Sequence, residues 1–287
     1  MSEYPQNLLA RLRVVGEVDL SQRATGEPDW WPKDAPRSKR KAAKRLEAIA
    51  AELTELQERL FASALHGQLR DSLLLVLQGM DTAGKGGIVR HVMGLFDPQG
   101  VDHHAFKAPT DEEQAHDFLW RVQQRLPGPG IIGVFDRSHY EDVLIHRVQK
   151  LSSTQQIEAR YPKIVDFEHA LHERGIHLHK VMLHIGPAEQ YARLSERLDR
   201  EDKHWKYSPA DVEDRLLFAE YQRAYELAIE RTATVDAPWY VIPADQKWRA
   251  RLCVAELLLH TLREIDPLWP KADFDVAAER KRLDATK

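Results

Sequence analysis

The chain has 287 residues, of which 43% are hydrophobic, so it is long enough for one large α/β domain or for one domain with helical additions. Its 41 Lys and Arg residues against 45 Asp and Glu give a net charge near −4, which argues against broad binding to nucleic acid or membranes. Cys253 is the only cysteine, which excludes an intramolecular disulfide and a multi-cysteine metal site, and we interpret it as a helix-packing residue.

Residues 1–70 are expected to form an N-terminal arm and an amphipathic helix that pack on the core. The first 20 residues contain no apolar stretch of signal-peptide length, and no later segment approaches 18 uninterrupted apolar residues, so we expect a cytoplasmic protein. Several prolines, with Trp30 and Trp31, indicate an irregular arm over residues 1–36. Apolar residues at spacings of three and four predict a helix from Ser38 to about Ala64. We favour docking of its apolar stripe on the same chain, with a second subunit as the alternative. A homo-oligomer is expected.

Strand and helix patterns alternate along the rest of the chain. This order predicts βαβ units and a three-layer αβα fold, in which a five-stranded parallel sheet is covered by helices on both faces. The expected domain spans residues 71–270, and residues 271–287 are expected to form a C-terminal tail. The predicted strands cover residues 72–78, 101–107, 131–135, 177–185 and 239–243. The predicted helices cover residues 85–96, 111–125, 154–173, 188–198, 209–232 and 248–265.

A glycine-rich turn directly follows the first predicted strand of this domain. Residues 79–87 read GMDTAGKGG and fit the pattern G-x-x-x-x-G-K. Glycines allow backbone N–H groups to turn inward around a phosphate, and Lys85 adds a mobile positive charge. The pattern therefore indicates a P-loop that binds linked phosphates, with a plain strand-to-helix turn as the alternative. The loop glycines expected at the ligand are Gly79, Gly84, Gly86 and Gly87.

The loop departs from the usual P-loop pattern at two positions. Gly86 stands where a Ser or Thr hydroxyl normally holds Mg²⁺. Asp81 supplies a carboxylate inside the loop, where phosphates would repel it unless a divalent cation lay between them. Asp81 is therefore predicted to be a metal ligand.

The third predicted strand of the domain delivers a second carboxylate. Asp136 follows the apolar run of residues 131–135, as a Walker B position requires, because neighbouring strand ends face the same phosphate. Asp81 and Asp136 are predicted to share Mg²⁺, and Arg137 is predicted to bind phosphoryl oxygens through its two-pronged guanidinium. A surface salt bridge is the alternative for the Asp136–Arg137 pair.

A charged segment before the last predicted strand carries a third group of basic residues. Arg193 and Arg197 lie on one face of a predicted helix, and Lys203 and Lys206 follow it. In nucleotide kinases an arginine-rich lid occupies this place and closes over the transferring phosphoryl group. We predict a helical lid at about residues 188–210. A solvated helix is the alternative, because nearby acids almost cancel the positive charge.

These motifs together resemble the second polyphosphate kinase family, whose members have a P-loop kinase core with a lid. The likeness runs from about Leu56 to about Trp269. It rests on GMDTAGKGG at 79–87, FDRSHYEDVL at 135–144, RLSERLDREDKHWKYSPAD at 193–211 and APWYVIPAD at 237–245. The first two motifs in combination are specific, because an Asp inside the loop and a Gly after its lysine distinguish this family from ordinary nucleoside monophosphate kinases.

The resemblance implies reversible, Mg²⁺-dependent transfer of a phosphoryl group between inorganic polyphosphate and a nucleotide, with Mn²⁺ as a possible substitute. It implies that Asp81, Lys85, Asp136 and Arg137 are the essential residues. The stretch that contains Glu141 resembles the matching stretch of the subgroup that accepts AMP as well as ADP. Members of this subgroup form ADP from AMP and ATP from ADP. Lys107 and Thr110 resemble part of the acceptor-nucleotide loop. The alternatives are an ATP-dependent small-molecule kinase and a non-catalytic P-loop module that senses nucleotide or polyphosphate.

Overall fold

The structure, a computed structural model, describes residues 4–287 and is built around a twisted sheet of six strands in the order β1-β6-β5-β2-β4-β3. The strands are β1 (Arg13–Val14), β2 (Ser72–Gln78), β3 (Val101–Ala105), β4 (Ile132–Asp136), β5 (Ile176–His184) and β6 (Trp239–Pro243). Strands β2 to β6 pair in parallel, and each lies within two residues of a predicted strand. β2 and β6 are buried along their whole length, which explains their almost continuous apolar runs.

The predicted count of five strands is wrong by one, because the N-terminal arm adds β1. Arg13 pairs with Tyr240 and Val14 with Trp239 in an antiparallel register, so β1 covers the free edge of β6. The arm is also less irregular than expected, since it begins with a short helix, α1 (Gln6–Leu12). Trp31, further along the arm, is 2% exposed and belongs to the hydrophobic core.

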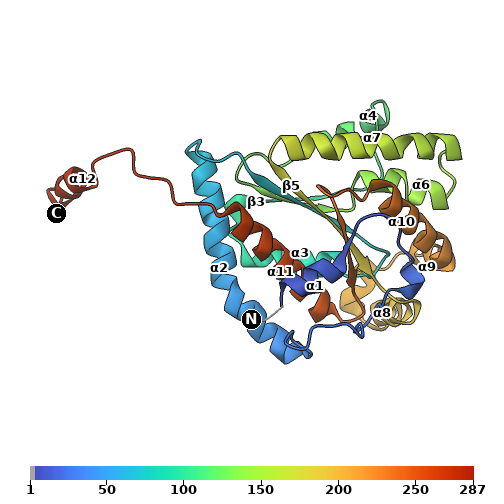
Figure 1. Cartoon of the computed structure of the whole chain (residues 1–287). Coiled ribbons are helices and arrows are strands. Elements are labelled where there is room, and N and C mark those ends of the chain that lie inside the picture. The colour runs from blue at the N-terminus through green and yellow to red at the C-terminus, as the bar shows by residue number, and fades with distance from the viewer. Residues whose placement is uncertain (1–3) are drawn as a thin grey trace.

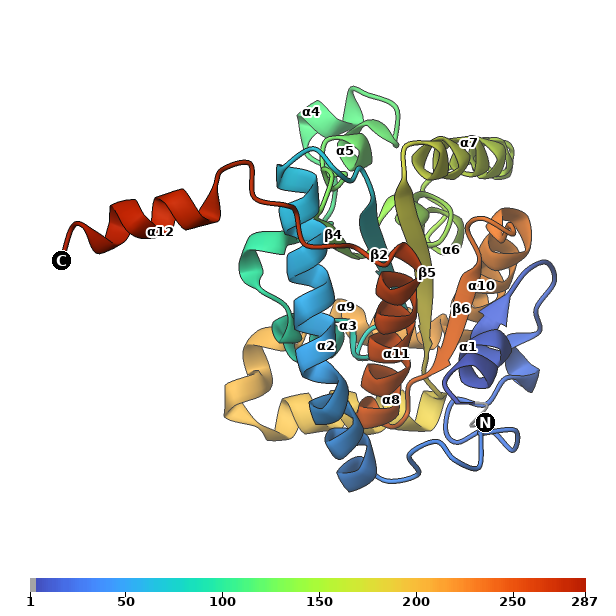
Figure 2. The ribbon, with the colours of Figure 1, turned by 60° about the vertical axis from the view of Figure 1, so that its left-hand side comes forward.

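Helices cover both faces of the sheet, as the three-layer prediction requires (Figures 1 and 2). The helices α7 (Thr154–Glu173) and α10 (Phe218–Thr232) lie on one face, and α2 (Lys39–Leu65), α3 (Lys85–His91) and α11 (Lys247–Ile265) lie on the other. The smaller helices are α4 (Asp111–Gln114), α5 (Trp120–Gln123), α6 (Ile145–Val148), α8 (Pro187–Asp199), α9 (Ala210–Leu216) and α12 (Val276–Asp284). Short 3₁₀ segments include Leu20–Gln22, His139–Asp142 and Glu201–Lys206.

Helix α2 packs along α11 of the same chain, which is the first of the two arrangements considered for its apolar stripe. Ile49, Leu53 and Leu60 are buried in this contact. Cys253 is fully buried in α11, in agreement with its interpretation as a packing residue. Beyond α11, the chain leaves the body and ends in α12, which stands apart from the rest of the molecule (Figure 1). Within residues 4–287, no helix has both the length and the apolar character of a membrane span.

Candidate active site

The glycine-rich turn after β2 has the backbone of a phosphate-binding loop. Gly79 has φ +147°, and a Cβ there would lie 2.8 Å from the carbonyl oxygen of Leu183, so only glycine fits. Gly84, with φ +117°, caps the first turn of α3, whose leading N–H groups have no acceptor inside the helix. The Lys85 ammonium donates to the carbonyl of Gly79 at 2.7 Å and so folds back across the loop. The loop is therefore shaped to present N–H groups and a positive charge to an anion.

The end of β4 brings a second carboxylate to this loop. β2 and β4 are paired in parallel, with Leu77 opposite Asp136, so the predicted adjacency of these two strands is confirmed. The Arg137 backbone, at φ +65°, donates its N–H to the carbonyl of Leu77 at 3.0 Å. Its guanidinium lies 3.3 Å from a carboxylate oxygen of Asp81. The local turn therefore brings the Arg137 guanidinium to the loop, while part of its side chain stays exposed.

Arg137 lies between two carboxylates, and this keeps it charged. Burial by itself would lower the pKa of the Arg137 guanidinium, but Glu141 and Asp81 raise it above its ordinary value. Burial raises the pKa of Glu141, and Arg137 and Lys85 oppose that rise. The result is a compact group of alternating charges at the carboxyl ends of β2 and β4.

A cleft of about 650 Å³ opens over the P-loop and the end of β4. It is lined by most of the residues predicted at the site, namely Asp81, Gly84, Lys85, Gly86, Gly87, Asp136, Arg137, Arg193, Arg197, Lys203 and Lys206. Gly79 and Glu141 instead line a narrower pocket of about 40 Å³, which shares Asp81 and Arg137 with the cleft. A large cleft and a smaller pocket thus meet at the Asp81–Arg137 pair, near the carboxyl ends of β2 and β4.

Two predicted residues lie outside both spaces. Lys107 is exposed, and its carbonyl accepts a hydrogen bond from Arg121 at 2.8 Å. Thr110 caps α4 in a reciprocal capping box with Glu113. The structure therefore gives Thr110 a local structural task, and their contact with an acceptor nucleotide stays a prediction.

The cleft also contains basic residues that the sequence reasoning missed. Arg90 from α3 and Lys247 and Arg251 from α11 line it, together with His91. No carboxylate lies within ion-pair distance of Arg90 or Arg251 in the described chain. Burial lowers the pKa of Arg251, and Arg193 and Arg90 lower it further. The spacing of Lys247 and Arg251, one helical turn apart at the start of α11, is the signal that could have indicated them.

The segment predicted as a lid supplies the roof of the cleft. Arg197 of α8 donates at 3.0 Å both to Asp211 and to the carbonyl of Lys206. Lys203 pairs with Asp202 at 3.1 Å, and the ammonium of Lys206 lies 4.9 Å from the centre of the Trp205 ring. Trp205 itself is 78% exposed.

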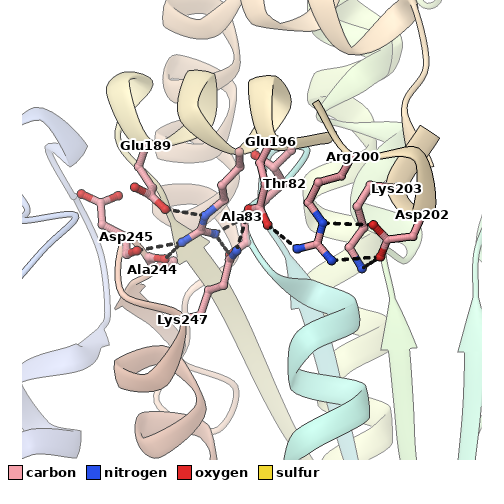
Figure 3. A network of polar contacts seen from close by, with 11 residues as sticks. Thr82, Ala83, Glu189, Glu196, Arg200, Asp202, Lys203, Ala244, Asp245 and Lys247 are labelled. Atoms are coloured by element: carbon pink, nitrogen blue, oxygen red, sulfur yellow. Dashed lines mark hydrogen bonds and ion pairs between the residues drawn. The ribbon is translucent and has the colours of Figure 1, made fainter. Parts of the chain in front are cut away.

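Arg193 has a different task from the expected contact with phosphoryl oxygens. Its guanidinium is buried and donates to the carbonyls of Thr82 and Ala83 at 2.8 and 3.1 Å. It also donates to the carbonyls of Ala244 and Asp245 at 2.7 and 2.8 Å, and to the Glu189 carboxylate at 2.7 Å. Figure 3 shows these acceptors converging from three segments. All five N–H donors of an arginine are thereby used, so Arg193 joins the P-loop to the segment after β6.

The cleft can hold a divalent cation between its two floor carboxylates. Asp81 and Asp136 both line it, and Mg²⁺ is ordinarily bound through one or two carboxylates, with water and substrate phosphates completing its shell. Within the described residues there is no cluster of three or more His, Cys, Asp or Glu side chains that would form an all-protein cage. The donor set therefore fits an ion that is completed by phosphate rather than one held by protein alone.

A parallel sheet with a glycine loop after one strand, an Asp at the end of its neighbour and a basic roof defines a P-loop kinase. The model of the polyphosphate kinase 2 family matches residues 36–268. The chain belongs to this family. It is 44% identical over 231 residues to the AMP/ADP-polyphosphate phosphotransferase of Meiothermus ruber, covering 79% of this chain and 85% of that protein.

Other relatives give the same result. The ADP-polyphosphate phosphotransferase of Rhodopseudomonas palustris is 40% identical over 245 residues, which are 80% of this chain and 81% of that protein. The crystal structure of polyphosphate kinase 2 from Arthrobacter aurescens superposes with a TM-score of 0.90 at 49% identity, covering 96% of this chain and 95% of the other. The similarity therefore extends over nearly the whole fold, beyond the motifs.

Proposed function

We propose that this protein transfers the terminal phosphoryl group of inorganic polyphosphate to nucleotides, forming ATP from ADP and ADP from AMP. The observation that carries the proposal is the lining of the large cleft. It contains many basic side chains, while no Phe, Tyr or Trp is among the described residues that line it. Such a cleft suits a chain of phosphates better than ATP, since a donor nucleotide would need an apolar or aromatic surface for its base.

Asp81 and Asp136 are the proposed ligands of Mg²⁺, with Mn²⁺ as a substitute. A bound ion at this place would neutralise phosphate charge and help to align donor and acceptor. The phosphate of the acceptor is already largely ionised near pH 7, since its second pKa is about 6, so the protein needs no general base. Direct in-line transfer without a phosphoenzyme follows from this arrangement.

Lys85 and Arg137 are the proposed partners of the transferring phosphoryl group. The Lys85 ammonium bonds the Gly79 carbonyl at 2.7 Å, from where a rotation of its flexible side chain can exchange that acceptor for a phosphate oxygen. Arg137 retains free donors, because Asp81 is the only side-chain partner that its guanidinium has within residues 4–287. Both residues would neutralise charge on non-bridging oxygens.

We propose that the acceptor nucleotide approaches the reacting phosphates from the side of the narrow pocket, next to Asp81 and Arg137. Glu141 lines it together with Tyr221 and Tyr225, so it offers the aromatic surface that the large cleft lacks. The Meiothermus ruber relative is named as an AMP/ADP phosphotransferase, which supports acceptance of both nucleotides. Lys107 and Thr110 line neither the cleft nor this pocket, and their contact with the acceptor is part of the proposal.

We further propose that residues 188–210 act as a lid, in which Arg197, Lys203 and Lys206 close over bound polyphosphate. A cytoplasmic location is part of the same proposal, because it would give the protein access to AMP, ADP and ATP. Its homo-oligomeric state stays a prediction.

The assignment is tested by supplying polyphosphate as the sole phosphoryl donor. Purified protein with long-chain polyphosphate, Mg²⁺ and either ADP or AMP should form ATP or ADP, which chromatography separates. A matched reaction with ATP as donor and a nucleoside as acceptor tests the ATP-dependent kinase. Turnover only in the second reaction would favour the ATP-dependent kinase. Tight phosphate binding without turnover in either reaction would favour the non-catalytic sensor module.

Replacing Arg193 with alanine should lower kcat by roughly a hundredfold, because loss of its bonds releases the P-loop from the segment after β6. The melting temperature should also fall, since several buried carbonyls lose their donors. Arg193→Lys should not restore kcat, because a single ammonium cannot reach both pairs of carbonyls. Arg200→Ala is the matched control, since Arg200 makes only exposed ion pairs at the end of the same helix. A wild-type kcat in Arg193→Ala would contradict this positioning role.

A further inference from the structure

A second basic cleft lies on the outer edge of the sheet, where the N-terminal arm crosses β6. It has a volume of about 330 Å³, and we call it the arm cleft. Its basic residues are Arg11, Arg13 and Arg23, and Trp30 and Pro243 form part of its walls. None of the described residues that line it is Asp or Glu. It shares no lining residue with the cleft over the P-loop.

The arm cleft arises from the way in which the arm is attached. β1 pairs with β6 so that Val14 is buried and Arg13 is exposed. The turn Leu20–Gln22 then brings Arg23 back toward the end of α1, where its guanidinium donates to the carbonyl of Arg11 at 3.2 Å. Leu20 fixes this turn, because its N–H donates to Glu226 at 3.0 Å and its carbonyl contacts the His184 ring at 3.1 Å.

The three arginines lack the carboxylate partners that other arginines of this region have. No Asp or Glu lies within ion-pair distance of Arg11, Arg13 or Arg23 in residues 4–287. In contrast, Arg37 and Arg249 both pair with Glu27. Burial lowers the pKa of Arg23, and no neighbouring acid opposes the change. A half-buried guanidinium that no carboxylate neutralises is costly, and an external anion would reduce that cost.

We propose that the arm cleft binds linked phosphate groups, either of inorganic polyphosphate or of a nucleotide, as a site separate from the catalytic cleft. Three guanidiniums without carboxylates match an anion that carries several charges along a short length. Their forked donors suit phosphate oxygens. Among the described residues, Arg13 and Arg23 each donate one side-chain hydrogen bond to a backbone carbonyl, so most of their donors remain available to the ligand. Binding here needs no acceptor and no turnover, so it does not depend on the catalytic assignment.

Calorimetric titration of the full chain with tripolyphosphate in the presence of Mg²⁺, but without acceptor, tests the proposal. Wild-type protein should show two binding events per chain, and the triple variant Arg11→Gln, Arg13→Gln and Arg23→Gln should show one. The matched control Arg280→Gln, Lys281→Gln and Arg282→Gln removes the same charge from the separate helix α12 and should keep both events. Two unchanged events in the arm variant, or an equal loss in the control, would overturn the proposal.

Arg11→Gln alone covers the case in which the triple variant does not fold, since Arg11 is exposed and its side chain makes no hydrogen bond within the described part of the chain. It should weaken the second event by about tenfold, as expected for the loss of one charged hydrogen bond. A parallel titration with ADP distinguishes the two ligand sources. A second event with tripolyphosphate alone identifies inorganic phosphate chains, and one with ADP identifies nucleotides. Wild-type affinity of Arg11→Gln for both ligands would contradict the site.

Discussion

Replacing Asp136 with alanine should reduce phosphoryl transfer from polyphosphate to ADP to below a few per cent of the wild-type rate. Asp136 stands at the end of β4 and lines the cleft with Asp81, so its loss removes one of the two proposed metal ligands. A metal contact at the reacting phosphates contributes several kcal/mol to the stability of the transition state. Initial rates at saturating polyphosphate, ADP and Mg²⁺ provide the measurement.

The matched control for this change is Glu196→Gln, which removes another carboxylate from the same cleft. Glu196 lies on α8 and pairs with Arg200 and Lys247, away from the β4 end, so its loss should change the rate only a few-fold. Both variants should melt within a few degrees of the wild type. If Asp136→Ala retained more than a few per cent of the activity, Asp136 would not be an essential metal ligand.

Replacing Lys180 with methionine should destabilise the fold by about 3–5 kcal/mol and lower the melting temperature by roughly 10 °C. Lys180 is 0% exposed, and its ammonium donates to Glu168 at 2.5 Å and to the carbonyl of Thr232 at 2.7 Å. Burial alone would raise the pKa of Glu168, but Lys180 and His139 lower it below its ordinary value. The variant would leave the Glu168 carboxylate buried without its cation. Thermal melting followed by circular dichroism measures the effect.

The double variant Lys180→Met and Glu168→Leu provides the control. It removes both charges together, and replacement of a buried ion pair by apolar residues of similar volume is often neutral. It should therefore melt at a higher temperature than Lys180→Met alone. A Lys180→Met protein that melts with the wild type would show that the buried pair contributes nothing to stability.

The buried Lys180–Glu168 pair is also connected to the active site through Tyr140. The hydroxyl of Tyr140 donates to Glu168 at 2.6 Å and lies 2.9 Å from the Thr232 hydroxyl. Tyr140 belongs to the turn His139–Asp142, which begins two residues after Arg137 and carries Glu141. The orientation of Arg137 and Glu141 thus depends on a polar network in the core. The contacts of this network cannot be read from a sequence motif.

Local patterns predicted most of the fold. The helix Thr154–Glu173 has the predicted bounds, because Ser153 and Gln156 form a capping box at its start. The predicted helix 111–125 is broken between α4 and α5, where Asp117 accepts the N–H of Leu119 and starts a new turn. Strand β1 could not be predicted, because two residues show no alternation and their partner strand lies more than 200 residues away.

The sequence predicted those residues of the candidate site that belong to one of two short, continuous motifs. Asp81, Lys85, Asp136 and Arg137 line the cleft because the ends of adjacent parallel strands must meet. Residues that only tertiary packing brings to the cleft were not found, and Arg90, Lys247 and Arg251 are the examples. The spacing of basic residues on α8 could not distinguish a phosphate ligand from backbone carbonyls. The role of Arg193 was therefore visible only in the structure.

The proposed phosphoryl transfer depends on a single ion between the loop carboxylate of Asp81 and the strand-end carboxylate of Asp136. A crystal structure of the wild-type protein with Mn²⁺ and tripolyphosphate, located by anomalous scattering, tests this most directly. We expect one Mn²⁺ peak that touches an oxygen of Asp81, an oxygen of Asp136 and a phosphate oxygen, each at about 2.1 Å. An ion that binds phosphate while neither carboxylate touches it directly would contradict the proposed chemistry.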